Sequence, residues 1–151
     1  MNKRWDAGRI YQSSAIQGAT PIELVILLYD AVIQDLGRAL AAMRSGEIER
    51  RTTEVGHALL VLQQLQGTLD FERGGSAARQ FEQFYNLVRA KILEAQMRGS
   101  AELLREQFRY LSEVRECWIE VQSRSQAQSS PASVTDAAMQ EIEMKRGEWR
   151  A

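Results

Sequence analysis

Thr20-Pro21-Ile22-Glu23-Leu24-Val25-Ile26-Leu27-Leu28-Tyr29-Asp30 is a helix start that runs directly into an apolar block. Thr20 can accept a hydrogen bond as an N-cap, Pro21 suits the first helical position, and Glu23 completes a capping box. The five residues after Glu23 are all apolar, and together they cover every direction around a helix axis. We therefore predict a helix that begins at Pro21 and carries more apolar surface than a single core-facing stripe requires.

The composition favours one cytosolic domain with one hydrophobic core. Of the 151 residues, 44% are hydrophobic, and a chain of this length buries about two thirds of its unfolded surface. The formal net charge of -1 argues against nucleic acid or an anionic membrane as a partner. The longest apolar run is far shorter than the roughly twenty residues that span a bilayer. A single cysteine and an N-terminus without a secretory signal pattern fit a reducing compartment.

Glycines and polar pairs divide the rest of the chain into amphipathic segments. Because the only prolines are Pro21 and Pro131, long helices can form between them. We expect helices with apolar residues at steps of three and four over residues 21–44, 47–71, 76–98 and 101–122. In the second helix this stripe comprises Ile48, Thr52, Val55, Leu59, Leu62, Gln66 and Leu69. The short connections predict an all-α fold, an antiparallel up-down-up-down four-helix bundle over residues 20–122.

Two segments flank the predicted bundle. Residues 1–19 place Ile10 and Tyr11 in a polar context, which predicts an N-terminal arm that docks rather than folding alone. Residues 123–133 are rich in serine and glutamine, the composition of a flexible linker. A second capping-box pattern then predicts a short amphipathic fifth helix over residues 134–151.

The residue types needed for catalysis or metal binding are nearly absent. Metal and haem sites in helical bundles need several inward histidines, and His57 is the only histidine in the chain. Its position off the apolar stripe predicts a solvated side chain. Cys117, next to Trp118, is interpreted as a packing residue, because no nearby histidine would lower its pKa. We therefore predict no enzymatic activity, no catalytic residue, no metal and no cofactor.

The apolar excess of residues 24–29 has two interpretations that composition alone does not separate. These residues can form core together with a buried contact to the N-terminal arm. They can equally line an exposed groove that accepts a segment of a partner protein. The second interpretation makes the chain a binding protein, and a helical adaptor is one such class.

Three blocks of sequence resemble the flagellin export chaperone family, FliS. The first joins Tyr11 to the helix start and to the Leu-Leu-Tyr-Asp-Ala-Val run of residues 27–32. The second is Leu69-Asp70-Phe71-Glu72-Arg73-Gly74-Gly75, and the third combines Phe84-Tyr85 with Leu93-Glu94-Ala95-Gln96. This sequence has Thr20 where the family commonly has serine, and Ala31 where it has glycine. Trp118 matches a tryptophan near the end of the family's last bundle helix.

The resemblance implies a cytosolic chaperone that binds the disordered C-terminal segment of flagellin and prevents premature polymerisation. It would deliver flagellin to the flagellar type III export apparatus, with an export gate component as a further partner. A disordered client can wrap a large surface and become ordered on binding. The alternative is a helical-bundle adaptor protein with a non-flagellin partner.

Within this interpretation the candidate client contacts lie on the first helix and on the arm. We predict Leu24, Leu27 and Tyr29 on the outer side of the helix, and Ile10 and Tyr11 on a movable arm. We also expect the arm, or the C-terminal tail around residues 142–149, to cover an apolar groove until the client displaces it.

Overall fold

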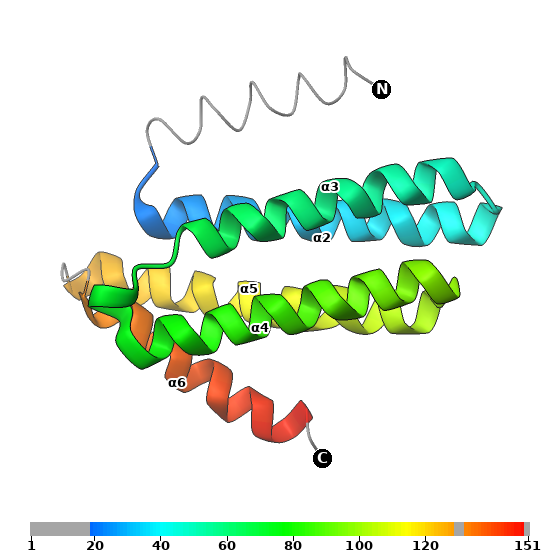
Figure 1. Cartoon of the computed structure of the whole chain (residues 1–151). Coiled ribbons are helices and arrows are strands. Elements are labelled where there is room, and N and C mark those ends of the chain that lie inside the picture. Colours follow the sequence, from blue (N-terminus) through cyan, green and yellow to red (C-terminus); the bar gives the residue numbers. More distant parts are fainter. Residues whose placement is uncertain (1–18, 129–131, 150–151) are drawn as a thin grey trace.

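The structure is a computed structural model that describes residues 19–128 and 132–149. Over these ranges it is all-α, without a strand, and its helices are α2 (Pro21–Ser45), α3 (Ile48–Gly67), α4 (Phe71–Arg98), α5 (Ala101–Gln128) and α6 (Ala132–Trp149). Helices α2 to α5 form an antiparallel up-down-up-down bundle, and α6 lies obliquely below α4 (Figure 1). The predicted four-helix bundle and its C-terminal fifth helix are confirmed. None of the described helices is long and apolar enough to cross a membrane.

Helix α2 begins where the sequence predicts. The Thr20 hydroxyl accepts a hydrogen bond from the Glu23 amide, and the Glu23 carboxylate accepts one from the Thr20 amide. This reciprocal capping box satisfies two amides that the first helical turn leaves without partners. At the other end Gly46 takes a left-handed conformation with φ of 71°, which glycine adopts without steric cost.

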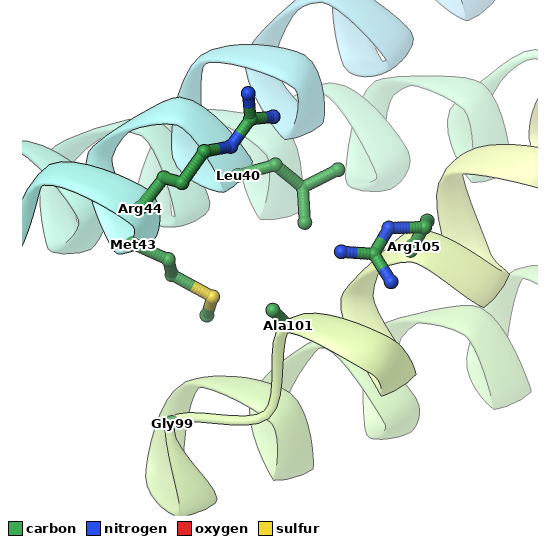
Figure 2. Close-up of a pocket in the computed structure, with 6 residues that line it drawn as sticks. All are labelled: Leu40, Met43, Arg44, Gly99, Ala101 and Arg105. Carbon is green, nitrogen blue, oxygen red and sulfur yellow. The ribbon is translucent and has the colours of Figure 1, made fainter.

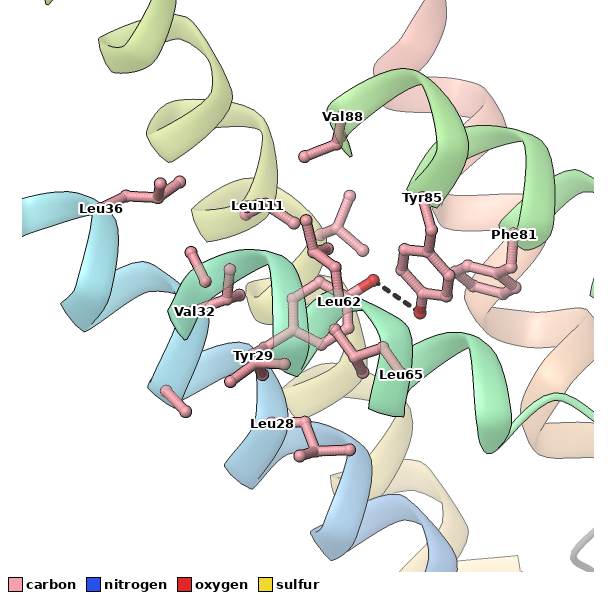
Figure 3. Packing of buried hydrophobic residues seen from close by; sticks show 14 of the residues in the cluster. Leu28, Tyr29, Val32, Leu36, Leu62, Leu65, Phe81, Tyr85, Val88 and Leu111 are labelled. Carbon is pink, nitrogen blue, oxygen red and sulfur yellow. Dashed lines mark hydrogen bonds between the residues drawn. The ribbon is translucent and has the colours of Figure 1, made fainter. Parts of the chain in front are cut away.

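The bundle helices pack as a ring. Helix α2 contacts α3 and α5, helix α4 contacts the same two helices, and α6 contacts α4 and α5. The core lies on the axis of this ring, where Tyr29 of α2 meets Tyr85 of α4 and the hydroxyl of Tyr29 donates to that of Tyr85 over 3.0 Å (Figure 3). The ring creates four outer seams, one between each pair of neighbouring helices.

Helix α4 starts earlier than expected. Asp70 caps it by accepting hydrogen bonds from the amides of Glu72 and Arg73, both at 3.1 Å. A first turn of helix follows, and Gly75 then breaks the helical geometry with φ of 51° and ψ of -123°. The paired glycines therefore lie inside a kinked helix rather than in the turn before it, because the Asp70 cap allows helix formation upstream of them.

Helix α5 extends six residues into the segment predicted as a linker. Residues 123–128 are helical, and the Ser123 hydroxyl bonds back to the Ile119 carbonyl at 3.2 Å. Arg124 pairs with Glu141 of α6 at 2.5 Å. Composition alone predicted a flexible linker from residue 123, but contact with α6 supports the last turns of α5.

Candidate functional site

Ionic contacts bridge the outer seam between α2 and α3. The carboxylate of Asp35 is fully buried and contacts Arg38 at 2.8 Å and His57 Nδ1 at 2.5 Å. Arg38 also reaches Glu54 across the seam at 3.2 Å. The His57 side chain is only 20% exposed, so the prediction of a solvated histidine is wrong. It faces α2 because the inward face of α3 is centred on residues 54, 58, 61 and 65, beside Val55 and Leu62, which the predicted stripe correctly placed in the core.

Amide side chains bridge the seam between α3 and α4. Gln66 donates to Asn86 at 2.7 Å, and Arg89 donates to Gln66. Near the other end of the bundle, Gln96 donates to Thr52 at 2.9 Å. The seam between α4 and α5 is covered differently, because α6 packs against both helices. Polar side chains thus bridge the α2/α3 and α3/α4 seams, and a helix covers the α4/α5 seam.

The remaining seam, between α2 and α5, carries a line of half-buried apolar side chains. Ile26, Ile33 and Leu40 follow one another at intervals of seven on α2, and all three are partly buried against the core. On α5, Phe108 faces this line, since a methyl group placed on Gly37 would lie 3.7 Å from its ring. We call this surface the α2/α5 seam.

An open hollow lies at each end of the α2/α5 seam. One, of about 250 Å³, is lined by Ala19, Glu23, Ile26, Leu27 and Gln122. The other, of about 170 Å³, is lined by Leu40, Met43, Arg44, Gly99, Ala101 and Arg105. Figure 2 shows Leu40 between the two arginine side chains, which come from opposite helices. Each end of the seam therefore has room for an apolar side chain, and the second end also presents positive charge.

Asp30 and Arg115 form an ion pair across the middle of the seam. Both side chains are about one third exposed. The Tyr-Asp pair that ends the apolar block thus has two structural tasks, because Tyr29 enters the core while Asp30 ties α2 to α5. Neither task requires a ligand.

The structure places only some of the predicted client contacts at the surface of the bundle. Leu27 lines a hollow of the seam, and Leu24 is partly buried against the core. Tyr29 is wholly buried, so its predicted place on the outer side of the helix is wrong. Its ring packs against Tyr85, with the centroids 6.2 Å apart. Residues 10 and 11 lie outside the described residues.

Helices α3 and α4 carry further exposed apolar side chains that were not predicted from the sequence. The exposed large apolar side chains there are Ile48, Leu60, Phe71, Leu87, Leu93 and Met97. Apart from Ile48, which was assigned to the core stripe of α3, these residues fall outside the predicted stripes. Large apolar residues between two stripe positions were the available signal, and they indicate a second face that a partner can contact.

The titratable groups of the core do not form a reactive centre. Burial raises the pKa of both Tyr29 and Tyr85, so the two hydroxyls remain protonated hydrogen-bonding groups. Burial also raises the pKa of Cys117, the opposite of what a nucleophilic thiol requires. Within residues 19–128 and 132–149, no group of three potential metal ligands comes together. The surfaces described above can bind a partner, and the buried groups hold the bundle together.

Comparison with known proteins identifies the family. The sequence model of the family described as flagellar protein FliS matches residues 4–125, which include α2, α3, α4 and most of α5. The chain belongs to the FliS family. The match contains the whole α2/α5 seam, whereas α6 lies beyond it. The resemblance carried by the three sequence blocks is thereby confirmed.

Individual FliS relatives are similar along most of their length. The flagellar secretion chaperone FliSB of Pseudomonas aeruginosa is 30% identical over 112 residues, which are 72% of this chain and 89% of the relative. The flagellar secretion chaperone FliS of Salmonella typhimurium is 26% identical over 118 residues, 78% of this chain and 87% of the relative. The Bacillus subtilis FliS chaperone is 24% identical over 110 residues, covering 72% and 80%. The relatives are named as chaperones, and FliS proteins are not enzymes, as predicted for this chain.

Proposed function

We propose that this chain is a flagellar secretion chaperone that works in the cytosol on flagellin. It binds the disordered C-terminal segment of flagellin, prevents premature polymerisation and delivers the client to the flagellar type III export apparatus, where an export gate component receives it. The observation that carries this proposal is membership of the FliS family over the part of the chain that builds the α2/α5 seam.

The α2/α5 seam suits a long apolar segment of a client. Between Ala101 and Gln122, which line the opposite hollows, α5 rises by about 32 Å at 1.5 Å per residue. Apolar side chains at intervals of seven along α2 match one face of a client helix laid along the groove. The hollows can accept one anchoring side chain at each end. A segment of about twenty residues would therefore be held along its whole length.

Binding of this kind explains how a chaperone without enzymatic chemistry can control assembly. A client segment that is disordered when free loses conformational entropy when it orders on the chaperone, and burial of apolar area offsets that loss. The apolar side chains used for contacts between flagellin subunits would then be hidden. The exposed apolar side chains of α3 and α4 offer a second surface to a client that wraps around the bundle.

Co-purification tests this function. The full-length chain should retain full-length flagellin but not flagellin that lacks its C-terminal segment. Equal capture of both forms would contradict the proposed binding mode. Capture of neither form, by a chaperone whose circular dichroism shows an intact helical bundle, would favour an adaptor with another partner.

A further inference from the structure

Helix α6 packs on α4 and α5, and its buried side chains belong to the same apolar cluster as two aromatic residues of these helices. Phe81 of α4 stacks on Trp118 of α5, with the ring centroids 5.4 Å apart. Beside Trp118, Cys117 is only 1% exposed, and Lys145 and Glu141 of α6 are its main charged neighbours. The thiol is therefore shielded from solvent on the side where α6 lies. Removal of α6 would expose the thiol and apolar area around it.

Few apolar contacts hold α6 in place. Its buried apolar side chains among those described are Ala138, Met139 and Ile142. Met144, two residues further on, is 72% exposed. Most helical stability in proteins comes from tertiary packing, so the 18-residue α6 depends on this small interface.

A carboxylate on the docking face of α6 weakens the interface further. Glu141 is buried, and it faces Glu120 and Arg124 of α5 with Lys145 one turn away on α6. Sharing a hydrogen bond with Glu120, together with burial and repulsion between the carboxylates, raises the pKa of Glu141. The ion pair with Arg124 offsets part of the cost of burying Glu141. Because the Arg124 side chain is largely exposed, this ion pair adds little to the stability of the docked helix.

The FliS family match includes the surface on α4 and α5 but not the helix α6 that packs on it. Phe81, Cys117 and Trp118 lie inside the matched residues 4–125, whereas all of α6 lies after them. The surface thus lies within the family match, and the helix that occupies it in this chain lies outside that match. Because its present occupant is a helix, the surface accepts a helical segment.

We propose that α6 is a detachable cover of a helix-docking surface formed by α4 and α5, and that an amphipathic helix of the flagellin C-terminal segment takes its place. The identity of the client rests on the proposed function. While α6 is docked, the apparent affinity for flagellin is reduced by the fraction of molecules in which the surface is open.

The sole cysteine reports directly on this cover. In the full-length protein, Ile142→Ala should increase the rate of Cys117 modification by a thiol reagent by at least about tenfold, because it deletes the central buried contact of α6. The same variant should bind the flagellin C-terminal segment severalfold more tightly, and bound segment should protect Cys117 again. Met144→Ala, a truncation of an exposed side chain on the same helix, should change neither quantity.

Two results would overturn the proposal. The first is an unchanged rate of Cys117 modification in both Ile142→Ala and Met139→Ala, which would mean that α6 is not a removable cover. The second is faster modification without any gain in flagellin affinity or protection, which would mean that the client does not use this surface. If the wild-type protein does not bind flagellin, the proposed function and the assigned client both fail, while the modification rates still decide whether α6 detaches. A circular dichroism melt separates detachment of α6 from unfolding of the bundle.

Discussion

The hydroxyls of Tyr29 and Tyr85 meet at 3.0 Å in the centre of the bundle, and this bond joins α2 to α4 across the core. Both side chains are almost entirely buried. The bond satisfies the buried Tyr85 hydroxyl, while the Tyr29 hydroxyl also interacts with Trp118, and the pair therefore fixes how the two helices face each other. The tyrosine in the opening apolar block thus specifies the bundle rather than contacting a client.

We predict that Tyr29→Phe lowers the free energy of unfolding by about 1–3 kcal/mol, because it leaves the buried Tyr85 hydroxyl without its donor. The double variant Tyr29→Phe/Tyr85→Phe should recover part of this loss, since no buried hydroxyl then remains unpaired. Urea unfolding of the two single variants and the double variant measures the coupling. Strict additivity of the two single effects would contradict the role assigned to the bond.

The contact between His57 and Asp35 should also support stability. His57→Ala removes a contact to a fully buried carboxylate and should cost about 1–3 kcal/mol in urea unfolding at pH 7. Arg50→Ala is the matched control, because it removes an ion pair whose two side chains are each about half exposed. That control should cost less than about 1 kcal/mol. Equal losses in the free energy of unfolding would show that the buried contact stabilises the protein no more than the exposed ion pair does.

Two glycines should respond in opposite directions to the same substitution. Gly37 lies inside α2, and an added methyl group would make an ordinary contact with Phe108, so Gly37→Ala should stabilise the protein by about 0.5–1 kcal/mol. Gly46→Ala forces a left-handed conformation on alanine and should destabilise by about 1 kcal/mol. Thermal unfolding of the two variants provides the comparison. Destabilisation by Gly37→Ala would mean that the seam is packed more tightly than described.

Docking of α6 should weaken as the pH rises. The pKa of Glu141 is raised above its ordinary 4.5 when α6 is docked, so the docked state favours the protonated carboxyl. Its stabilising effect is fully present below about pH 4.5 and is lost as the pH rises through the raised pKa. The pKa of Glu120 is lowered by the shared hydrogen bond, so this carboxyl contributes to the pH dependence with the opposite sign.

The measurement is the protection of Cys117, taken as the ratio of its modification rates in unfolded and native protein at each pH. Protection should fall as the pH rises above about 4.5 in the wild-type protein. Glu141→Gln keeps a hydrogen-bonding group without the charge, so it should flatten this dependence and increase protection at pH 7. A steeper dependence in Glu141→Gln would contradict the assignment to this carboxyl.

Local sequence signals predicted the helices well because each has a local physical cause. The cap formed by Thr20 and Glu23 starts α2, and left-handed Gly46 and Gly99 follow the ends of α2 and α4. The predicted steps of three and four hold in α4 and α5, because a single apolar stripe dominates each helix. Phe81 of α4 and Leu111 of α5, which follow this spacing, are buried.

Features that depend on contacts between distant residues were not accessible from the sequence. Helix α3 offers two adjacent stripes. The structure buries Val55 and Leu62 of the predicted stripe together with Ala58 and Leu65 of the other, while Gln66 bonds to α4 on the surface. Which residues of the two stripes are buried depends on packing against α2. Tyr29 lies in a block that is apolar in every direction, and its partner is 56 residues away. The candidate site was not predictable for the same reason, because the α2/α5 seam is formed by two helices that are far apart in the sequence.

The central claim is that the α2/α5 seam binds the C-terminal segment of flagellin. The most direct test is the affinity of that segment for the wild-type chain, for Ile33→Gln in the middle of the seam, and for Met144→Gln on the exposed side of α6. We predict that Ile33→Gln weakens binding by at least about tenfold, as expected for loss of a central apolar anchor, and that Met144→Gln has no effect. Wild-type affinity in a correctly folded Ile33→Gln variant would contradict the account.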